Sequence, residues 1–105
     1  MTYIEELQKK SSEILLQRAE QRGHHSKLYR LLAQRWSQHV GVPVSESTVC
    51  LMLSDMKIAR EIAGKNDEDN IVDLVNYAYL YADLTHKSDD DRVIIDTLSR
   101  LNKGD

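Results

Sequence analysis

The sequence predicts an all-α fold, built as a single domain over residues 1–105. Hydrophobic residues make up 41% of the chain and charged residues 30%, with one Pro and four Gly, a composition typical of a helical protein with few tight turns. No stretch shows the strict alternation that marks a half-buried strand, whereas apolar residues recur at helical spacing. A chain of this length closes one core, so a functional site must lie in it, beside it or between subunits.

Two helices are expected in the first forty residues. The first begins after Thr2 and ends near Gly23, because glycine commonly stops a helix. One narrow stripe of this helix carries Ile4, Leu7, Ile14, Leu15 and Arg18. The second helix is capped by Ser26 and ends before Gly41 and Pro43. Its apolar residues at helical spacing are Leu28, Leu32, Trp36 and Val40.

Three more helices are expected in the rest of the chain. The third begins at Ser45 or Ser47 and runs to Gly64, and the fourth runs from Asn70 to about Thr85. A short fifth follows the acidic turn at 88–92, where carboxylates favour the positive end of a helix dipole. Short polar turns predict a compact bundle of about five helices with antiparallel neighbours. The third and fourth helices are the most apolar and are expected at its centre.

The fourth helix combines a broad apolar surface with a narrow polar stripe. At about 100° per residue, the stripe holds Asp69, Asp73, Asn76, Leu80 and Asp83. The rest of the helix is apolar and includes three tyrosines, which together with the tryptophan of the second helix are expected to pack: Trp36, Tyr77, Tyr79 and Tyr81. Two interpretations of the stripe stay open. It is either a thin solvated strip on a buried helix, or an inward-facing site for a metal and phosphate.

Asp55 bears on this choice because it is the one carboxylate on an apolar arc of the third helix. Such a group is costly to bury unless it is paired, hydrogen-bonded or bound to a cation. Three explanations stay open: an ion pair with Arg35 or Arg18, a cap on another helix, or a ligand for Mg²⁺ shared with Asp69 and Asp73. Oxygen ligands without nitrogen partners suit Mg²⁺ and not zinc.

Several other residues carry weaker signals. Lys57 and Arg60 lie within one turn of the third helix and are candidates for phosphate binding, with a solvated or ion-paired role as the alternative. His24 and His25 fall in a glycine-containing turn, where exposed histidines without a third ligand seldom bind metal. Cys50 has no partner for a disulfide and no evident activating group.

Composition excludes some classes of function. The net charge of −3 disfavours a domain that works by neutralising nucleic-acid phosphates. A helix-turn-helix over residues 32–55 is a third interpretation, but its turn is long and its second helix starts with Glu46 and lacks a basic residue before Lys57. No secretion signal or membrane span is visible, so the chain is expected in the cytoplasm.

The segment from Leu28 to Leu84 resembles an uncharacterised family of small phage and prophage proteins. The resemblance rests on a tryptophan helix, a Lys-x-x-Arg-like step and an Asp-x-x-x-Asp helix followed by a tyrosine, which here are Trp36, Lys57, Ala59, Arg60, Asp69, Asp73 and Tyr77. Relatives carry a Tyr-Gly-Asp element where this chain has the turn with His24 and His25. The resemblance implies a phage-type accessory protein in the cytoplasm of a bacterial host.

A carboxylate helix followed by an apolar segment is also similar, more distantly, to the all-α nucleoside triphosphate pyrophosphohydrolases, the MazG-like and dimeric dUTPase group. That similarity implies helical, oligomeric proteins that hold Mg²⁺ between a Glu-x-x-Glu helix and a Glu-x-x-Asp helix. Asp73 matches the final Asp, whereas Asn70 stands at the position of its Glu and no Glu-x-x-Glu is present. The carboxylate set is therefore incomplete for hydrolysis.

Two functions are predicted from these residues. The first is an accessory protein that binds, and in an enzymatic version hydrolyses, a nucleotide with Mg²⁺ on Asp55, Asp69 and Asp73, with Lys57 or Arg60 on phosphate. The second is a non-enzymatic module that binds a host or phage protein through helix faces. Both fit a homo-oligomer, because the third and fourth helices offer more apolar surface than a monomer of this size covers.

Overall fold

The computed structural model describes residues 1–23, 25–64, 66–86 and 100, and within them the chain is all-helical, as predicted. The helices in these residues are α1 (Tyr3–Arg22), α2 (Ser26–Val40), α3 (Glu46–Ile62) and α4 (Glu68–Thr85), and the same residues contain no strand. The described residues form four helices, whereas the sequence predicts about five. The fifth, expected after the turn at 88–92, lies outside the described residues.

Polar side chains at the helix starts set the boundaries of α1 and α3. Thr2 and Glu5 form a capping box, in which each side chain accepts a hydrogen bond of 3.2 Å from the other residue's backbone N–H. The Ser45 hydroxyl caps α3 by accepting a bond of 3.1 Å from the Thr48 N–H. The expected starts of both helices are therefore confirmed, with Ser45 and not Ser47 as the cap of α3.

The starts of α2 and α4 differ slightly from the prediction. α2 begins at Ser26 itself, and His25 occupies the N-cap position, so the prediction that Ser26 caps this helix is wrong by one residue. α4 begins two residues earlier than expected, because the Asp67 carboxylate accepts a hydrogen bond of 3.0 Å from the Asp69 N–H. Gly41 ends α2 in the left-handed conformation, with φ of 77°, which glycine adopts without steric cost.

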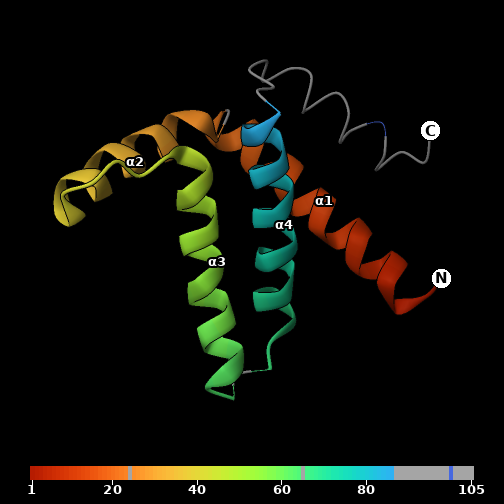
Figure 1. Ribbon diagram of the computed structural model, residues 1–105. Coiled ribbons are helices and arrows are strands. Elements are labelled where there is room, and N and C mark those ends of the chain that lie inside the picture. Colours follow the sequence, from red (N-terminus) through yellow and green to blue (C-terminus); the bar gives the residue numbers. More distant parts are fainter. Residues whose placement is uncertain (24, 65, 87–99, 101–105) are drawn as a thin grey trace.

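The helices are arranged around an antiparallel α3–α4 hairpin (Figure 1). α4 packs most extensively on α3 and also contacts α1, which crosses it obliquely, while α2 packs on α3. The central position of the two most apolar helices is confirmed. Among the described residues, α4 is covered mainly by α1 and α3 mainly by α2, and part of the hairpin surface is left open.

The core is small and lies where the four helices meet. Its buried apolar residues are Leu15, Tyr29, Ala33, Val49, Cys50 and Leu80, and the partly buried residues packed on them include Trp36 and Tyr77. The expectation that the tryptophan and Tyr77 pack is confirmed. The same expectation is wrong for Tyr79 and Tyr81, which are 43% and 36% exposed and lie on different sides of α4.

Candidate functional site

α4 buries its polar stripe and turns its apolar side outward. Asn76 is 2% exposed and Leu80 7% exposed, and the side chains of Asp73 and Asp83 are 19% and 10% exposed. Only Asp69, at the start of the helix, is open to solvent, with 79% of its side chain exposed. Of the two interpretations of the stripe, the inward-facing orientation is the observed one from Asp73 onward.

The inward-facing Asp73 is held by cations from two other helices. The ammonium of Lys57, on α3, lies 2.8 Å from one oxygen of the Asp73 carboxylate, and the guanidinium of Arg18, on α1, lies 3.4 Å from the other. The Lys57 side chain is only 9% exposed, so its charge depends on this carboxylate for compensation. Asp73 therefore joins three helices through charge.

Asn70 fixes the first turn of α4 to the last turns of α3. Its side-chain amide donates one hydrogen bond of 2.8 Å to the Lys57 carbonyl and another of 2.8 Å to the Glu61 carboxylate. The amide donor suits these two acceptors, whereas a glutamate at position 70 would place its carboxylate beside that of Glu61. The residue that departs from the pyrophosphohydrolase pattern thus has a structural role in this fold.

Four buried polar atoms on three side chains around α4 lack hydrogen-bond partners among the described residues. They are both amide atoms of Asn76, the Oδ1 atom of Asn70 and the Ser11 hydroxyl. Buried polar groups of this kind are uncommon and each one costs stability. They lie on the α1 and α3 sides of α4, which makes the interior more polar than the outer surface of the same helix.

The ionisable groups inside the core are held in their neutral forms. Burial raises the pKa of the Cys50 thiol to about 12, with the nearby Glu46 carboxylate adding to the effect. Burial also raises the pKa of Tyr29 well above its ordinary value, and it raises that of Tyr77 while the Lys57 charge opposes the shift. These residues therefore do not provide an activated thiolate or phenolate.

The three aspartates predicted to share Mg²⁺ do not meet. Asp55 lies exposed on the outer side of α3, turned away from Lys57, and Asp69 pairs at 3.5 Å with Lys10 of α1. Within residues 1–23, 25–64 and 66–86, no group of three or more His, Cys, Asp or Glu side chains is placed to hold a metal ion. Mg²⁺ binding and nucleotide binding stay predictions.

The two residues predicted to bind phosphate point in different directions. Lys57 is buried on Asp73, which matches the ion-paired alternative for this residue. Arg60 is exposed. His25, expected to be solvated, instead lies against α4, with its Nε2 atom 3.0 Å from an Asp83 carboxylate oxygen and 13% of its side chain exposed. His24 lies outside the described residues.

Two hollows flank the core. One, of about 530 Å³, opens between α1 and α4 and is lined by Arg18, Asp69 and Asp73 together with Ile14, Gln17, Gln21 and Val72. It contains two of the three predicted metal ligands. Because Asp73 is already compensated by Lys57 and Arg18, this hollow offers a cation only one uncommitted acidic group, and that group lies beside Lys10.

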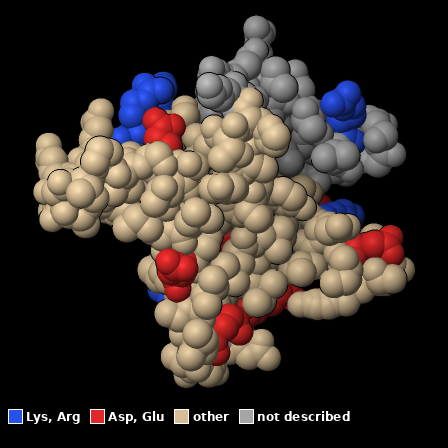
Figure 2. Space-filling view, viewed as in Figure 1, with Lys and Arg blue, Asp and Glu red and all other residues tan. Residues whose placement is uncertain are grey.

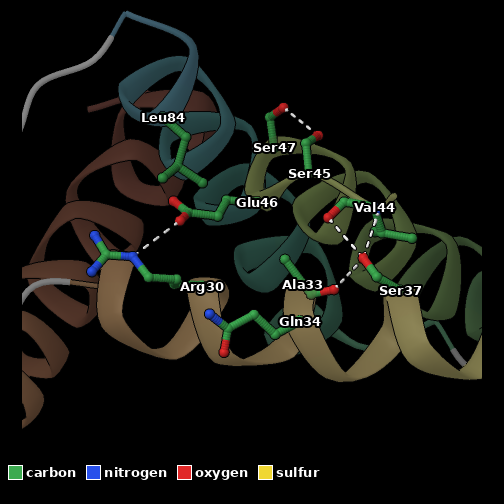
Figure 3. A pocket seen from close by; sticks show the side chains of 9 residues that line it. All are labelled: Arg30, Ala33, Gln34, Ser37, Val44, Ser45, Glu46, Ser47 and Leu84. Carbon is green, nitrogen blue, oxygen red and sulfur yellow. Dashed lines mark hydrogen bonds and ion pairs between the residues drawn. The ribbon is translucent and has the colours of Figure 1, made fainter. Parts of the chain in front are cut away.

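The second hollow, of about 450 Å³, lies between α2, the start of α3 and Leu84 (Figure 3). Its polar groups already have partners. Arg30 pairs with Glu46 at 3.4 Å, and the Ser37 hydroxyl donates to the Ala33 carbonyl at 2.6 Å and accepts from the Val44 N–H at 2.8 Å. These contacts tie the α2–α3 loop to α2 and leave no unpaired cation in the hollow for a phosphate.

The open side of the hairpin is apolar on both helices. Lys57 and Asp73 mark the line of contact between α3 and α4. Because the helices are antiparallel, the residue after Lys57 in α3 and the residue after Asp73 in α4 point to the same side of the helix pair. We call this surface the outer α3–α4 face and define it by Leu51, Ile58 and Ile62 of α3 and Leu74, Ala78 and Tyr81 of α4.

Side chains on the outer α3–α4 face are strongly exposed. Leu51 and Ile58 are 49% and 45% exposed, and Ile62 is 82% exposed. Figure 2 shows acidic side chains as separate patches among uncharged surface over the hairpin in this view. No helix in the described part of the chain is long and apolar enough to cross a membrane. The face therefore has the composition of a core without a covering layer.

Sequence reasoning placed the polar residues of α4 on one stripe but left open which way that stripe faces. The signal that could have found it is the pair Lys57 and Asp73, since a lysine among apolar neighbours on α3 needs a buried carboxylate nearby. Arg18, on the apolar stripe of α1, is a second such cation. Because Lys57 and Arg18 both point toward the centre, the polar side of α4 faces inward although the rest of that helix is apolar.

Residues 5–85 match a family model described as "Domain of unknown function (DUF6378)". No curated protein and no solved structure matches the chain at a significant level. This family match supports the resemblance to an uncharacterised family. Its phage origin and the more distant similarity to pyrophosphohydrolases stay predictions.

Proposed function

The chain belongs to the DUF6378 family, a domain of unknown function, and we propose that it is a non-enzymatic interaction module that binds a protein partner through the outer α3–α4 face. The observation that carries this proposal is the orientation of α4. The helix buries Asp73, Asn76 and Asp83 while Tyr79 and Tyr81 of its apolar arc are exposed, the reverse of what a helix on the surface of a monomer does.

The exposed apolar surface is too continuous to be a scatter of single residues. Isolated apolar side chains are common on protein surfaces, but contiguous patches larger than a few hundred Å² mark interaction sites. Here α3 adds Met52 and Ala59 beside the defining residues of the face, and Asp55 is the one charged residue on that side of the helix. A partner helix or helix pair fits such a surface through side-chain packing.

The polar interior supports binding better than catalysis. Asp73 is compensated by two cations, Asn70 is committed to α3, and Cys50 and the core tyrosines are neutral. General acid–base or nucleophilic catalysis needs a group that is both reachable and activated. The described residues instead use their charges to hold α1, α3 and α4 together.

The proposal is tested by photo-crosslinking with a matched pair of tyrosine positions. Tyr81 on the outer face and Tyr3 on α1 are each replaced by p-benzoylphenylalanine, and the chain is irradiated in cells of the organism that carries it. Both side chains are exposed, at 36% and 53%. We expect a discrete protein adduct from position 81 and none from position 3.

Equal adduct formation at both positions, or none at position 81, would contradict the proposal. An Ile58→Lys substitution in the position-81 chain serves as a further control. It places a charge on the same face without touching the crosslinking position, so it should abolish the adduct. The adduct's mass identifies the partner.

The predicted nucleotide function is the second candidate, and the α1–α4 hollow is the observation in its favour, since Asp69, Asp73 and Arg18 line it together. It is tested by thermal shift with Mg²⁺ plus a nucleoside triphosphate. We expect no shift, because Asp73 is occupied by Lys57. A shift that disappears in Asp69→Asn would place the nucleotide function ahead of the interaction function.

A further inference from the structure

We propose that the occupant of the outer α3–α4 face is a second copy of this chain, so that two hairpins pack face to face across a two-fold axis into a four-helix layer. This inference rests on the proposed function, because it names the partner of the same face. Antiparallel helix pairs stack readily in this way when each presents an apolar surface along its length.

The charge pattern of the face is compatible with self-association. A two-fold interface brings a surface against itself, so charges of one sign on it repel each other. None of the six defining residues is charged. Asp55 lies at the margin, about 40° around α3 from Leu51 on the side away from α4, where it stays in contact with solvent when the faces meet.

The dimensions of the face are of the order that a dimer interface requires. α3 has 17 residues and is therefore about 26 Å long, and two adjacent helices are about 20 Å wide. The footprint is on the order of 500 Å² in projection. The accessible area of a corrugated helix surface is larger than its projection, so the face approaches the roughly 800 Å² per partner of a standard interface.

The composition of the face favours a permanent partner over a transient one. Interfaces between chains that associate only part of the time are about as polar as the rest of the surface, whereas those of permanent homodimers resemble a core cut in half. Ile62, at 82% exposed, and Leu51, at 49%, are core-like side chains without cover. A second copy is present wherever the chain folds, so it can cover them from the start.

A second copy would also complete the core. Among the described residues the buried apolar side chains are Leu15, Tyr29, Ala33, Val49, Cys50, Val72 and Leu80. Association adds apolar burial to a small core of this kind. The half-buried Leu74 of α4 and the exposed Ile58 of α3 are placed to supply it from both chains.

Light scattering coupled to size-exclusion chromatography tests the inference on the full chain. The wild-type protein is expected at twice the chain mass of 12.1 kDa. Ile58→Lys and Ala78→Arg, one on each helix of the face, should shift the mass to that of one chain. Leu31→Lys is the matched control, because Leu31 is 54% exposed on α2, away from the face, and this variant should stay dimeric.

A second measurement guards against variants that unfold. Protein without ¹⁵N that carries a spin label on the Thr85→Cys position is mixed with ¹⁵N-labelled wild type. Paramagnetic relaxation enhancement is then measured on the ¹⁵N-labelled chain. Buried Cys50 does not take up the label under native conditions. We expect selective broadening in α3 and α4 of the labelled chain, and broadening confined to α1 or α2 would overturn the face-to-face arrangement.

The outcomes separate this inference from the proposed function. A single-chain mass for the wild type at all concentrations overturns the second-copy inference. If the photo-adduct from position 81 then contains a different protein, the interaction function stands with another partner. If that adduct is absent as well, both proposals fail.

Discussion

Asp73 is the residue on which the interior of this protein depends. Its two carboxylate oxygens face different cations, Lys57 from α3 and Arg18 from α1, and the lysine is nearly buried. A buried pair adds little net stability compared with apolar residues of the same shape, but removal of one partner leaves the other uncompensated. The pair therefore specifies which side of α4 faces inward more than it adds stability.

Asp73→Asn is expected to lower the free energy of unfolding by about 3 kcal/mol, near the lower end for breaking a buried pair because the carboxylate is partly exposed. The double variant Lys57→Met/Asp73→Asn should recover most of that loss, since it removes the stranded ammonium. Urea denaturation measures both. Equal stabilities for Asp73→Asn and the double variant would show that Lys57 does not depend on this carboxylate.

Cys50 provides a probe of local opening around α3. Its pKa of about 12 in the folded chain lies above the ordinary value of 9.0. A pKa raised by folding contributes stability that is fully present below pH 9 and is lost as pH rises toward 12, because the unfolded thiol ionises first. Stability should accordingly decline over that alkaline interval in the wild type and less steeply in Cys50→Ala.

Ellman's reagent gives the corresponding readout at pH 8. Native Cys50 should react only as fast as α3 opens, whereas a cysteine placed at the exposed position 8 (Gln8→Cys) should react at once. Immediate reaction of both thiols in the folded protein would be incompatible with a fully buried Cys50.

At the scale of elements, the loop between α2 and α3 is held by one hydroxyl. Ser37 donates to the Ala33 carbonyl of its own helix and accepts from the Val44 N–H of the loop. Ser54 of α3 makes only the first type of contact, to the Cys50 carbonyl at 2.8 Å. Both serines are partly buried, so their comparison isolates the contact to the loop.

Ser37→Ala should destabilise the protein by about 1 to 2 kcal/mol, because it leaves the Val44 N–H without its acceptor. Ser54→Ala should change stability by less than about 0.5 kcal/mol, since the Cys50 carbonyl keeps its helical partner. Thermal denaturation followed by circular dichroism compares the two. Similar losses would mean that the loop contact contributes nothing beyond the bond within the helix.

Much of this element-level structure could be predicted from the sequence. Caps at Thr2 and Ser45 and stops at Gly23 and Gly41 are local signals, and they located the helices to within two residues. The direction of α4 could not be predicted in the same way. A helical wheel shows that one side is polar, but only the positions of Lys57 and Arg18 on other helices decide whether that side faces the core.

The candidate site shows the same limit. Asp55, Asp69 and Asp73 were grouped by residue type and by the expected closeness of their helices. Closeness is confirmed for α3 and α4, yet Asp55 and Lys57 are two positions apart and point in nearly opposite directions. A shift of two positions along α3 therefore separates an aspartate facing solvent from a lysine facing the core.

At the scale of the whole molecule, the interior is unusually polar and the outer hairpin surface unusually apolar. The two features have one explanation if the described chain is half of a larger folded unit. The outer α3–α4 face then becomes the centre of that unit, and the charged cluster of Asp73 lies between its centre and its surface. Stability would depend on association.

The melting temperature of the wild type should accordingly rise with protein concentration, because association selects the folded chain. In Ile58→Lys the melting temperature should be lower and independent of concentration. Differential scanning calorimetry over a hundredfold concentration range measures both. A wild-type melting temperature that does not move over this range would argue against coupled folding and association.

The lone carboxylate on the outer side of α3 has a consequence for synthesis. α3 precedes α4 in the chain, so during translation its segment from Val49 to Ile62 emerges before either the hairpin or another copy can cover it. Asp55 is the first of four charged residues in that segment, followed by Lys57, Arg60 and Glu61, and charges within an apolar stretch hinder aggregation of nascent chains. An aspartate that is a candidate metal ligand by sequence is thus expected to matter before the native fold exists, while α3 is still uncovered.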